Sequence, residues 1–218
     1  MTSNRDEHIS RPKSYEPKEE TINNCRVIFP KDPKAGGTWI AMNENGVGAA
    51  LLNGAFERHI PTGNYAKSRG LVLLEIISSE RPSQYLDDLN LTNIEPFTIV
   101  LFDGSALIEF RWDGTRKYKK KMDLNKNHIW SSATLYTKEV IAHRKQLFNR
   151  FIVQNRDFNK ANIIKFHSNN NNDFENGFVI NRDNTLKTFS ITQLVFEHKN
   201  VEMNYYDLLK EERQTLNV

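Results

Sequence analysis

Five polar or ionisable side chains stand in a row near the start of the chain, at positions 4–8 (Asn-Arg-Asp-Glu-His). Adjacent opposite charges such as Arg5 and Asp6 can hold each other in a fixed pair. Pro12 and Pro17 stiffen the segment that follows, because the proline ring fixes φ. Residues so close to a terminus also commonly fray and carry little function. From these residues alone, a functional segment and a solvated tail both remain open.

Asn53 is a second candidate, because it ends an apolar run of strand length from Val47 to Leu52. A buried strand that delivers an amide to the edge of a site is well placed to stabilise an oxyanion, since the asparagine side chain donates hydrogen bonds. Gly54 follows directly, so the alternative interpretation is an asparagine selected for the turn. The spacing alone does not decide between the two.

Cysteine and histidine usage limits the metal and redox chemistry. The chain has one cysteine, Cys25, and six histidines. One cysteine allows no internal disulfide and no cysteine-rich zinc site, and a lone cysteine in a short apolar strand is more often a core residue than a nucleophile. The histidines show no ligand spacing and no Cys-x-x-Cys-His motif is present, so we predict neither a metal site nor a cofactor. His167 ends a predicted helix, where the helix dipole favours it.

Charge and hydropathy narrow the classes of partner. The 30 basic residues are offset by 27 acidic ones, so the chain lacks the global field that is typical of nucleic-acid binders. The basic run at 116–121 would be split across two faces of a strand, and we expect no nucleic-acid partner. No run of about 18 apolar residues and no apolar signal segment occurs, so we expect a cytoplasmic protein without a transmembrane segment.

The candidate residues must be held by helices and strands in alternating blocks. The Asn45-Gly46 pair between two apolar runs predicts a hairpin across residues 36–53. Apolar periodicity and capping residues predict helices at 68–77, 82–89, 137–154 and 159–167. Strands are predicted at 25–29, 97–102, 106–112, 115–121, 129–135, 178–180, 188–197 and 201–206. In the strand at 188–197 we place Thr188, Ser190 and Thr192 on the face opposite the buried one, and we predict a polar surface for residues 13–24 and the tail after Leu209.

This order of elements predicts the fold class. Helices arrive in pairs between blocks of mostly antiparallel strands, which favours an α+β layered sandwich over a doubly wound parallel sheet. A length of 218 residues is compatible with a single domain spanning residues 1–218.

Several motifs, taken as a set, resemble the NRDE family, which is also called the transport and Golgi organisation protein 2 family. The series runs in order through most of the chain. It comprises residues 2–8 (Thr-Ser-Asn-Arg-Asp-Glu-His) with Arg11-Pro12, residues 32–39 (Asp-Pro-x-Ala-Gly-Gly-Thr-Trp), Leu52-Asn53, Ser68-Arg69-Gly70 and Thr188-x-Ser-Ile-Thr192. The resemblance implies a single NRDE-family domain with a four-layer αββα sandwich of the N-terminal nucleophile hydrolase-like type, in which two antiparallel sheets pack between two helical layers.

The resemblance also implies an activity. Family members carry a cysteine after the initiator methionine, and removal of that methionine would leave a cysteine with a free amine, a nucleophile with its base built in. By similarity to cysteine amidohydrolases of this fold, Arg5 would lower the thiol pKa, Asp6 would orient the amine and Asn53 would donate to the oxyanion. The same motifs imply a substrate-binding role for Asn4, Glu7, Trp39 and Arg69.

This sequence departs from the family pattern at its start. Met1 stands where family members have a residue of the second strand, so the domain is N-terminally truncated relative to the family and lacks the nucleophile. Cys25 cannot replace it, because its amine is part of a peptide bond. Loss of an interior strand would cost ~1.5–3 kcal/mol for each buried apolar side chain, against a total stability of ~5–15 kcal/mol, so we favour a start further upstream over a real truncated form.

Three functions are compatible with these observations. The first is an amide-bond hydrolase that acts on an unknown amide when a cysteine-bearing N-terminus is present. The second is a non-catalytic carrier or chaperone in trafficking that binds a small molecule such as haem or a lipid in the same cleft, and the third is an interaction protein without a ligand.

Overall fold

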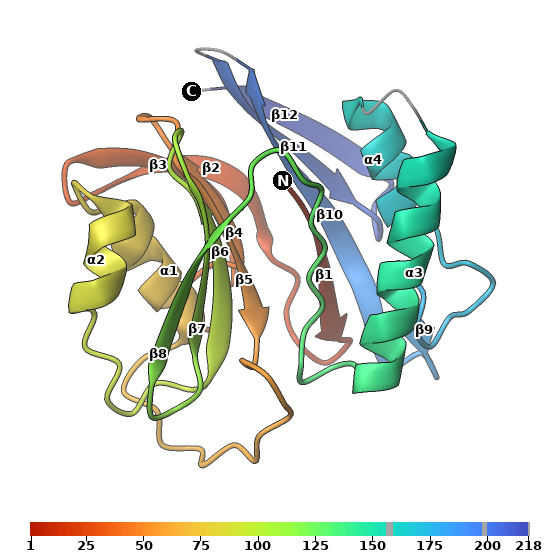
Figure 1. Cartoon of the computed structure of the whole chain (residues 1–218), viewed down its shortest axis with the longest axis horizontal. Coiled ribbons are helices and arrows are strands. Elements are labelled where there is room, and N and C mark those ends of the chain that lie inside the picture. Colours follow the sequence, from red (N-terminus) through yellow and green to blue (C-terminus); the bar gives the residue numbers. More distant parts are fainter. Residues whose placement is uncertain (156–158, 198–199, 218) are drawn as a thin grey trace.

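The computed structural model describes residues 1–155, 159–197 and 200–217. Figure 1 shows four layers: α1 and α2 cover one sheet, the second sheet lies beside the first, and α3 and α4 cover its outer face. The larger sheet has the order β2-β3-β4-β5-β6-β7-β8, and the smaller has the order β1-β10-β11-β12 with β9 paired to β10. Neighbouring strands are antiparallel throughout both sheets. The predicted α+β, αββα sandwich is therefore observed.

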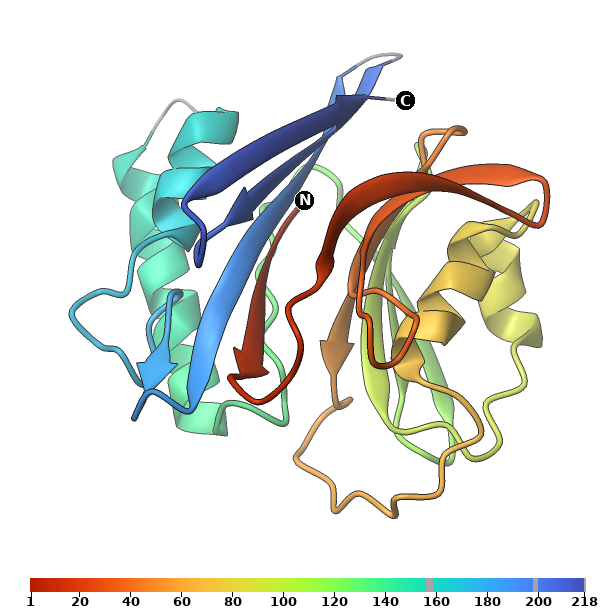
Figure 2. The same ribbon diagram turned by 180° about the vertical axis from the view of Figure 1, so that it is seen from behind.

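Apart from β1, the chain builds the two sides of the sandwich one after the other (Figure 2). The larger sheet with α1 and α2 comes first, and α3 and α4 with the smaller sheet follow. The strand β1, at the start of the chain, belongs to the smaller sheet. Among the helices of the described residues, none is long and apolar enough to cross a bilayer. In chain order the elements are β1 (Thr2–His8), β2 (Tyr15–Ile22), β3 (Cys25–Lys31), β4 (Ile40–Asn43), β5 (Gly48–Asn53), α1 (Arg69–Ile77), α2 (Pro82–Asp88), β6 (Phe97–Phe102), β7 (Leu107–Trp112), β8 (Lys117–Met122), α3 (Lys138–Gln154), α4 (Lys160–His167), β9 (Asn181–Arg182), β10 (Leu186–Glu197), β11 (Asn200–Asp207) and β12 (Glu212–Asn217).

The strand β5 is buried on both faces, as its continuous apolar run predicts. Ala49 belongs to the core between the larger sheet and α1, whereas its neighbour Ala50 belongs to the core between the two sheets. At Gly48 a Cβ atom would lie 2.3 Å from Cζ of Phe196 on β10. The absence of a side chain at Gly48 therefore allows the two sheets to approach each other at this point.

The helices begin where their capping residues predict. The Ser68 side chain accepts a hydrogen bond from the amide of Leu71 at the start of α1, and the Thr137 side chain accepts one from the amide of Val140 at the start of α3. Such caps satisfy amides that the first turn of a helix leaves without partners. Pro82 is the first residue of α2, also as predicted.

The β4–β5 hairpin is tied to α1 by Asn43. Gly46 adopts the left-handed φ of +76° that the turn requires, which confirms the turn predicted at Asn45-Gly46. The Asn43 carboxamide oxygen accepts from the amides of Asn45 and Val47, both at 3.0 Å. Its nitrogen donates to the carbonyl of Ile77 at the end of α1, at 2.8 Å. A buried side chain thus fixes the turn and holds the helix against the sheet.

Two segments expected to be polar surface, and one for which a solvated tail was one of two open interpretations, are strands. The segment at 2–8 forms β1 and pairs with β10, so the interpretation of a solvated tail is wrong. Residues 13–24 contain β2, and the tail after Leu209 contains β12. Both are edge strands of their sheets, and most residues of each are exposed or half-buried. These strands could not be recognised from their polar composition, because apolar and polar residues alternate only in a strand that has one buried face.

Two predicted strands are loops, and one predicted polar face is buried. Residues 129–135 turn at Ser132, whose carbonyl accepts the amides of Leu135 and Tyr136. Residues 178–180 precede the short strand β9 and lie outside it. On β10 the side chains of Thr188, Ser190 and Thr192 are all buried, so the face that was expected to be polar surface is covered.

We predict that the two asparagines of the hairpin differ sharply in their contribution to stability. Substitution N43A would leave the buried carbonyl of Ile77 and the amide of Val47 without partners, and should lower the free energy of unfolding by ~2–4 kcal/mol. Asn45 is exposed, and N45A should change the free energy of unfolding by less than ~0.5 kcal/mol. Urea unfolding of both variants is the measurement, and similar losses would contradict the role given to Asn43.

Candidate functional site

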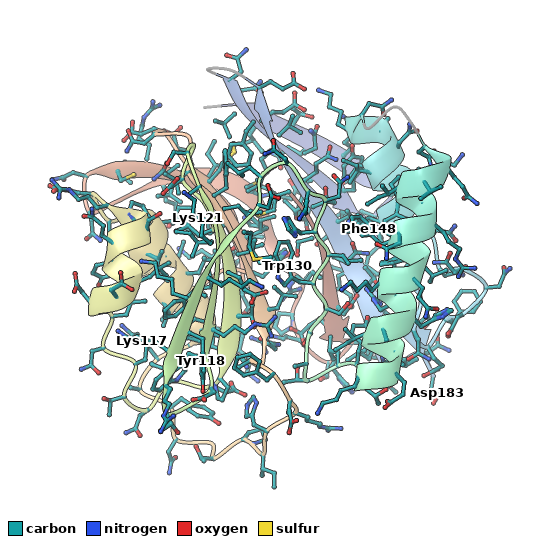
Figure 3. The ribbon with its side chains drawn as sticks, in the orientation of Figure 1. Lys117, Tyr118, Lys121, Trp130, Phe148 and Asp183 are labelled. Carbon is teal, nitrogen blue, oxygen red and sulfur yellow. The ribbon has the colours of Figure 1, made fainter. Side chains whose placement is uncertain are left out.

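A cavity of about 1070 Å³ lies beside β1, and it extends from the space between the sheets to the inner side of α3 and α4. Figure 1 shows the segment that joins β8 to α3 crossing in front of the gap between the sheets, and part of this segment lines the cavity. Figure 3 labels Trp130 on this crossing segment and Phe148 on α3. All seven predicted site residues line this one cavity: Asn4, Arg5, Asp6, Glu7, Trp39, Asn53 and Arg69.

The side chains of β1 reach two different layers. Arg5 and Glu7 lie on the side of the larger sheet, where Arg5 bonds to Asp32 after β3. Asn4 and Asp6 lie on the side of the helices, where Asn4 contacts α4 and Asp6 contacts Tyr136 before α3. Successive side chains of a strand point to opposite faces, so Arg5 and Asp6 do not form the fixed pair that their adjacency suggests.

On the side of the larger sheet, the carboxylate of Asp32 binds the guanidinium groups of Arg5 and Arg11. Asp32 Oδ2 accepts from Arg5 Nη2 at 2.8 Å and from Arg11 Nε at 3.0 Å, while Oδ1 accepts from the amides of Lys34 and Ala35, both at 2.9 Å. Burial raises the pKa of Asp32, but the hydrogen bonds from Ala35 and Arg11 and the two positive charges outweigh it and hold that pKa below its usual range. Asp32 is therefore the ionised anchor of this end of the cavity.

Two hydrogen-bond donors at this end have no acceptor within the described part of the chain. They are Arg5 Nη1 and Trp39 Nε1, and both atoms are buried. The Arg5 guanidinium carbon lies 4.6 Å from the centre of the Trp39 ring, so the two donors belong to one stacked pair. A buried donor without an acceptor costs ~1–3 kcal/mol, which a bound acceptor would recover.

On the helix side, Asp6 is enclosed by hydroxyl donors. Its oxygens accept from Thr188 Oγ1 at 2.6 Å and from the Tyr136 hydroxyl at 3.0 Å. Burial raises the pKa of Asp6, although both hydrogen bonds and the nearby Arg144 act in the opposite direction. Arg144 is itself buried, with its guanidinium carbon 4.2 Å from the centre of the Tyr136 ring.

His167 lies beside Asn4 at the same end of the cavity. Its Nδ1 is 2.6 Å from the carboxamide oxygen of Asn4, whose nitrogen donates to the carbonyls of His167 at 2.9 Å and Phe178 at 2.8 Å. Burial, with the charge of Arg144, lowers the pKa of His167 to about 3. His167 ends α4 as predicted, but its ring is neutral and does not act as a positive charge at the helix terminus.

The remaining predicted residues lie at the rim and the floor of the cavity. Asn53 is exposed at the end of β5, and its carbonyl accepts from Ser132 Oγ at 2.9 Å. Arg69 Nη2 forms an ion pair with Glu95 Oε2 at 3.1 Å, and burial lowers the pKa of Arg69. Cys25 is buried in the core under α1, does not line the cavity, and has its pKa raised chiefly by burial.

Several cavity residues have no signal in the sequence that would have identified them. Tyr136, Arg144 and His167 are far from β1 in the sequence, and the strand pairing and helix packing alone bring them to it. Among the described residues, no three His, Cys, Asp or Glu side chains gather in the way that a metal site requires. The residues that line the cavity are polar, aromatic and apolar side chains.

Comparisons with known proteins agree with this architecture. A family model described as Transport and Golgi organisation 2 matches residues 1–211. No curated protein matches the sequence. Among solved structures, penicillin V acylase from Agrobacterium tumefaciens is similar with a TM-score of 0.52 and 12% identity, over 100% of this chain and 78% of that chain. A mutant form of the conjugated bile acid hydrolase from Clostridium perfringens gives a TM-score of 0.48 and 13% identity, over 98% of this chain and 91% of that chain. The likeness to the acylase supports the N-terminal nucleophile hydrolase-like fold.

The lowered pKa of the half-buried His167 predicts a pH dependence of stability. Between pH ~6.5, the pKa of a histidine in the unfolded chain, and its folded pKa of about 3, the unfolded chain binds a proton that the folded chain does not. This side chain should therefore destabilise the fold as the pH falls through that window, by at most ~1.4 kcal/mol per pH unit. Urea unfolding of wild type and H167Q should show profiles that diverge on acidification. Parallel profiles would contradict the lowered pKa of His167.

Proposed function

This chain belongs to the Transport and Golgi organisation 2 family, and we propose that its cavity binds an amphipathic small molecule with an acidic head group and carries it without chemical change. The observation that carries the proposal is the cavity itself, whose volume of about 1070 Å³ lies just above the range of ~300–1,000 Å³ that is usual for small-molecule sites. All seven residues predicted for a site line it, so the motif residues and the cavity coincide.

The sheet-side end of the cavity suits an acidic head group. Arg5, Arg11 and Arg69 line it, and each guanidinium carries five N–H donors, of which some are already paired with the carboxylates that line the same end, Glu7, Asp32 and Glu95. Arg5 Nη1 and Trp39 Nε1 have no acceptor in the described chain. A ligand carboxylate would supply the acceptors that this end lacks.

The helix-side end suits an apolar body. Phe148, Phe151, Ile163 and Phe166 line it, and the Phe151 and Phe166 rings are stacked with centres 4.6 Å apart. Burial of apolar surface contributes roughly 25 cal/mol per Å², so a chain or ring system placed here would supply most of the binding energy. Haem and acyl lipids both combine acidic groups with an apolar body. The proposal places such a carrier in the cytoplasm.

Amide-bond hydrolysis is the second candidate, because Asp6 lies at the cavity wall in the fold of an acylase. Within the described chain the one cysteine is outside the cavity, so this activity needs another nucleophile. Intact-mass analysis and N-terminal sequencing of the protein from its own cells test this candidate. A terminal cysteine that forms an adduct with an acylating probe would support hydrolysis, and a protein without one would leave binding as the function.

A matched pair of tryptophan variants tests the carrier proposal. Dodecanoate should bind the wild type at least tenfold more tightly than dodecanol, because only the acid offers a charged acceptor to Arg5 and Trp39. Substitution W39F keeps an aromatic ring beside Arg5 but removes the free donor, and should reduce this preference about fivefold to tenfold. Isothermal titration calorimetry measures both affinities.

The control is W130F, which alters a cavity residue whose Nε1 already donates to Glu109 at 2.6 Å. This variant should keep the preference for the acid. Equal binding of acid and alcohol by the wild type, or equal effects of W39F and W130F, would contradict an acidic head group at this end.

A further inference from the structure

We infer that His167 Nε2 is a hydrogen-bond acceptor for the ligand, and that the apolar body of this ligand carries an O–H or N–H group. The inference rests on the proposed binding function and specifies the ligand further. It starts from the contacts between Asn4 on β1 and His167 at the end of α4. No motif in the sequence connects these two residues, which are 163 positions apart.

The orientation of the Asn4 carboxamide follows from its partners. One end of the group lies 2.9 Å from the carbonyl oxygen of His167 and 2.8 Å from that of Phe178. Carbonyl oxygens can only accept, so this end must be the nitrogen, which has two hydrogens to donate. The other end is then the oxygen, which can only accept.

The Asn4 oxygen in turn fixes the tautomer of His167. It lies 2.6 Å from Nδ1, and an acceptor at that distance requires a proton on Nδ1. A neutral imidazole has one N–H, so Nε2 carries a lone pair and no proton. Burial and the nearby charge of Arg144 disfavour a second proton on the ring. Asn4 therefore acts as a positioning residue that directs an acceptor at Nε2.

The His167 ring lies beside two aromatic rings, and the positive charge of Arg144 also acts on it. Within the described residues Nε2 has no hydrogen-bond partner, while His167 lines the cavity. The ring centres of Phe166 and Phe178 lie 5.8 Å and 6.1 Å from that of His167, and 4.2 Å from each other. A ligand that filled this end with hydrocarbon alone would leave the acceptor unpaired and without water, which costs binding energy. A ligand with one donor at this position avoids that cost.

A pair of aromatic probes tests the inference. The compounds 2-naphthol and 2-methoxynaphthalene share their ring system, but only the first can donate a hydrogen bond. We expect wild type to bind the naphthol about tenfold more tightly, and H167F to lose this preference. The matched control is H128F, because His128 also lines the cavity but its Nε2 lies 2.7 Å from the carbonyl of Asp123 and so donates. This variant should keep the preference.

A second readout does not depend on ligand affinity. Long-range ¹H–¹⁵N correlation spectra of the wild type should show His167 as the Nδ1–H tautomer, and N4A should lose this fixed tautomer. An Nε2–H tautomer in the wild type, or equal affinity for the two probes, overturns the inference. Binding of dodecanoate with no binding of either naphthalene overturns this inference alone. Failure of all three ligands overturns the proposed function with it.

Discussion

The alternation of side chains along β1 is the constraint on which the site depends. This strand pairs with β10, and its successive side chains point into different layers. Arg5 and Glu7 consequently meet the loop charges of the larger sheet, and Asn4 and Asp6 meet the residues of the helical layer. One short polar strand thus supplies both ends of a single cavity, and the charges at each end are separated by the strand itself.

Each end of the cavity is held by buried polar groups rather than by a close-packed apolar core. Removing one member of a buried ion pair is strongly destabilising, by ~3–5 kcal/mol, because it leaves an unpaired charge. The Arg5–Asp32 pair and the hydrogen-bonded Asp6 carboxylate therefore have two roles. They stabilise the position of β1, and they form part of the cavity wall. The buried core of the protein lies largely on the other side of the larger sheet, under α1 and α2. This division leaves α3 and α4 with a polar and aromatic cavity beneath them.

The sequence was sufficient for the layered α+β class and for the capped helices, because periodicity and caps are local signals. The resemblance, carried by motifs such as Asp32 to Trp39, identified seven of the residues that line the cavity. The edge strands β2 and β12 were missed, because exposed strands need no apolar alternation. The contact between Asn4 and His167 could not be predicted, because only the packing of α4 on β1 creates it. Residues 129–135 have the composition of a strand, but they form a loop that lines part of the cavity.

The central claim is that a ligand lies with its acidic end between the sheets and its apolar end under α3 and α4. Intermolecular nuclear Overhauser effects from ¹³C-labelled dodecanoate to the protein test this orientation most directly. The account predicts contacts from the methylene beside the carboxylate to the Trp39 indole N–H, and from the terminal methyl to the rings of Phe148 and Phe166. The reverse orientation, or a bound ligand without contacts to these residues, would contradict it.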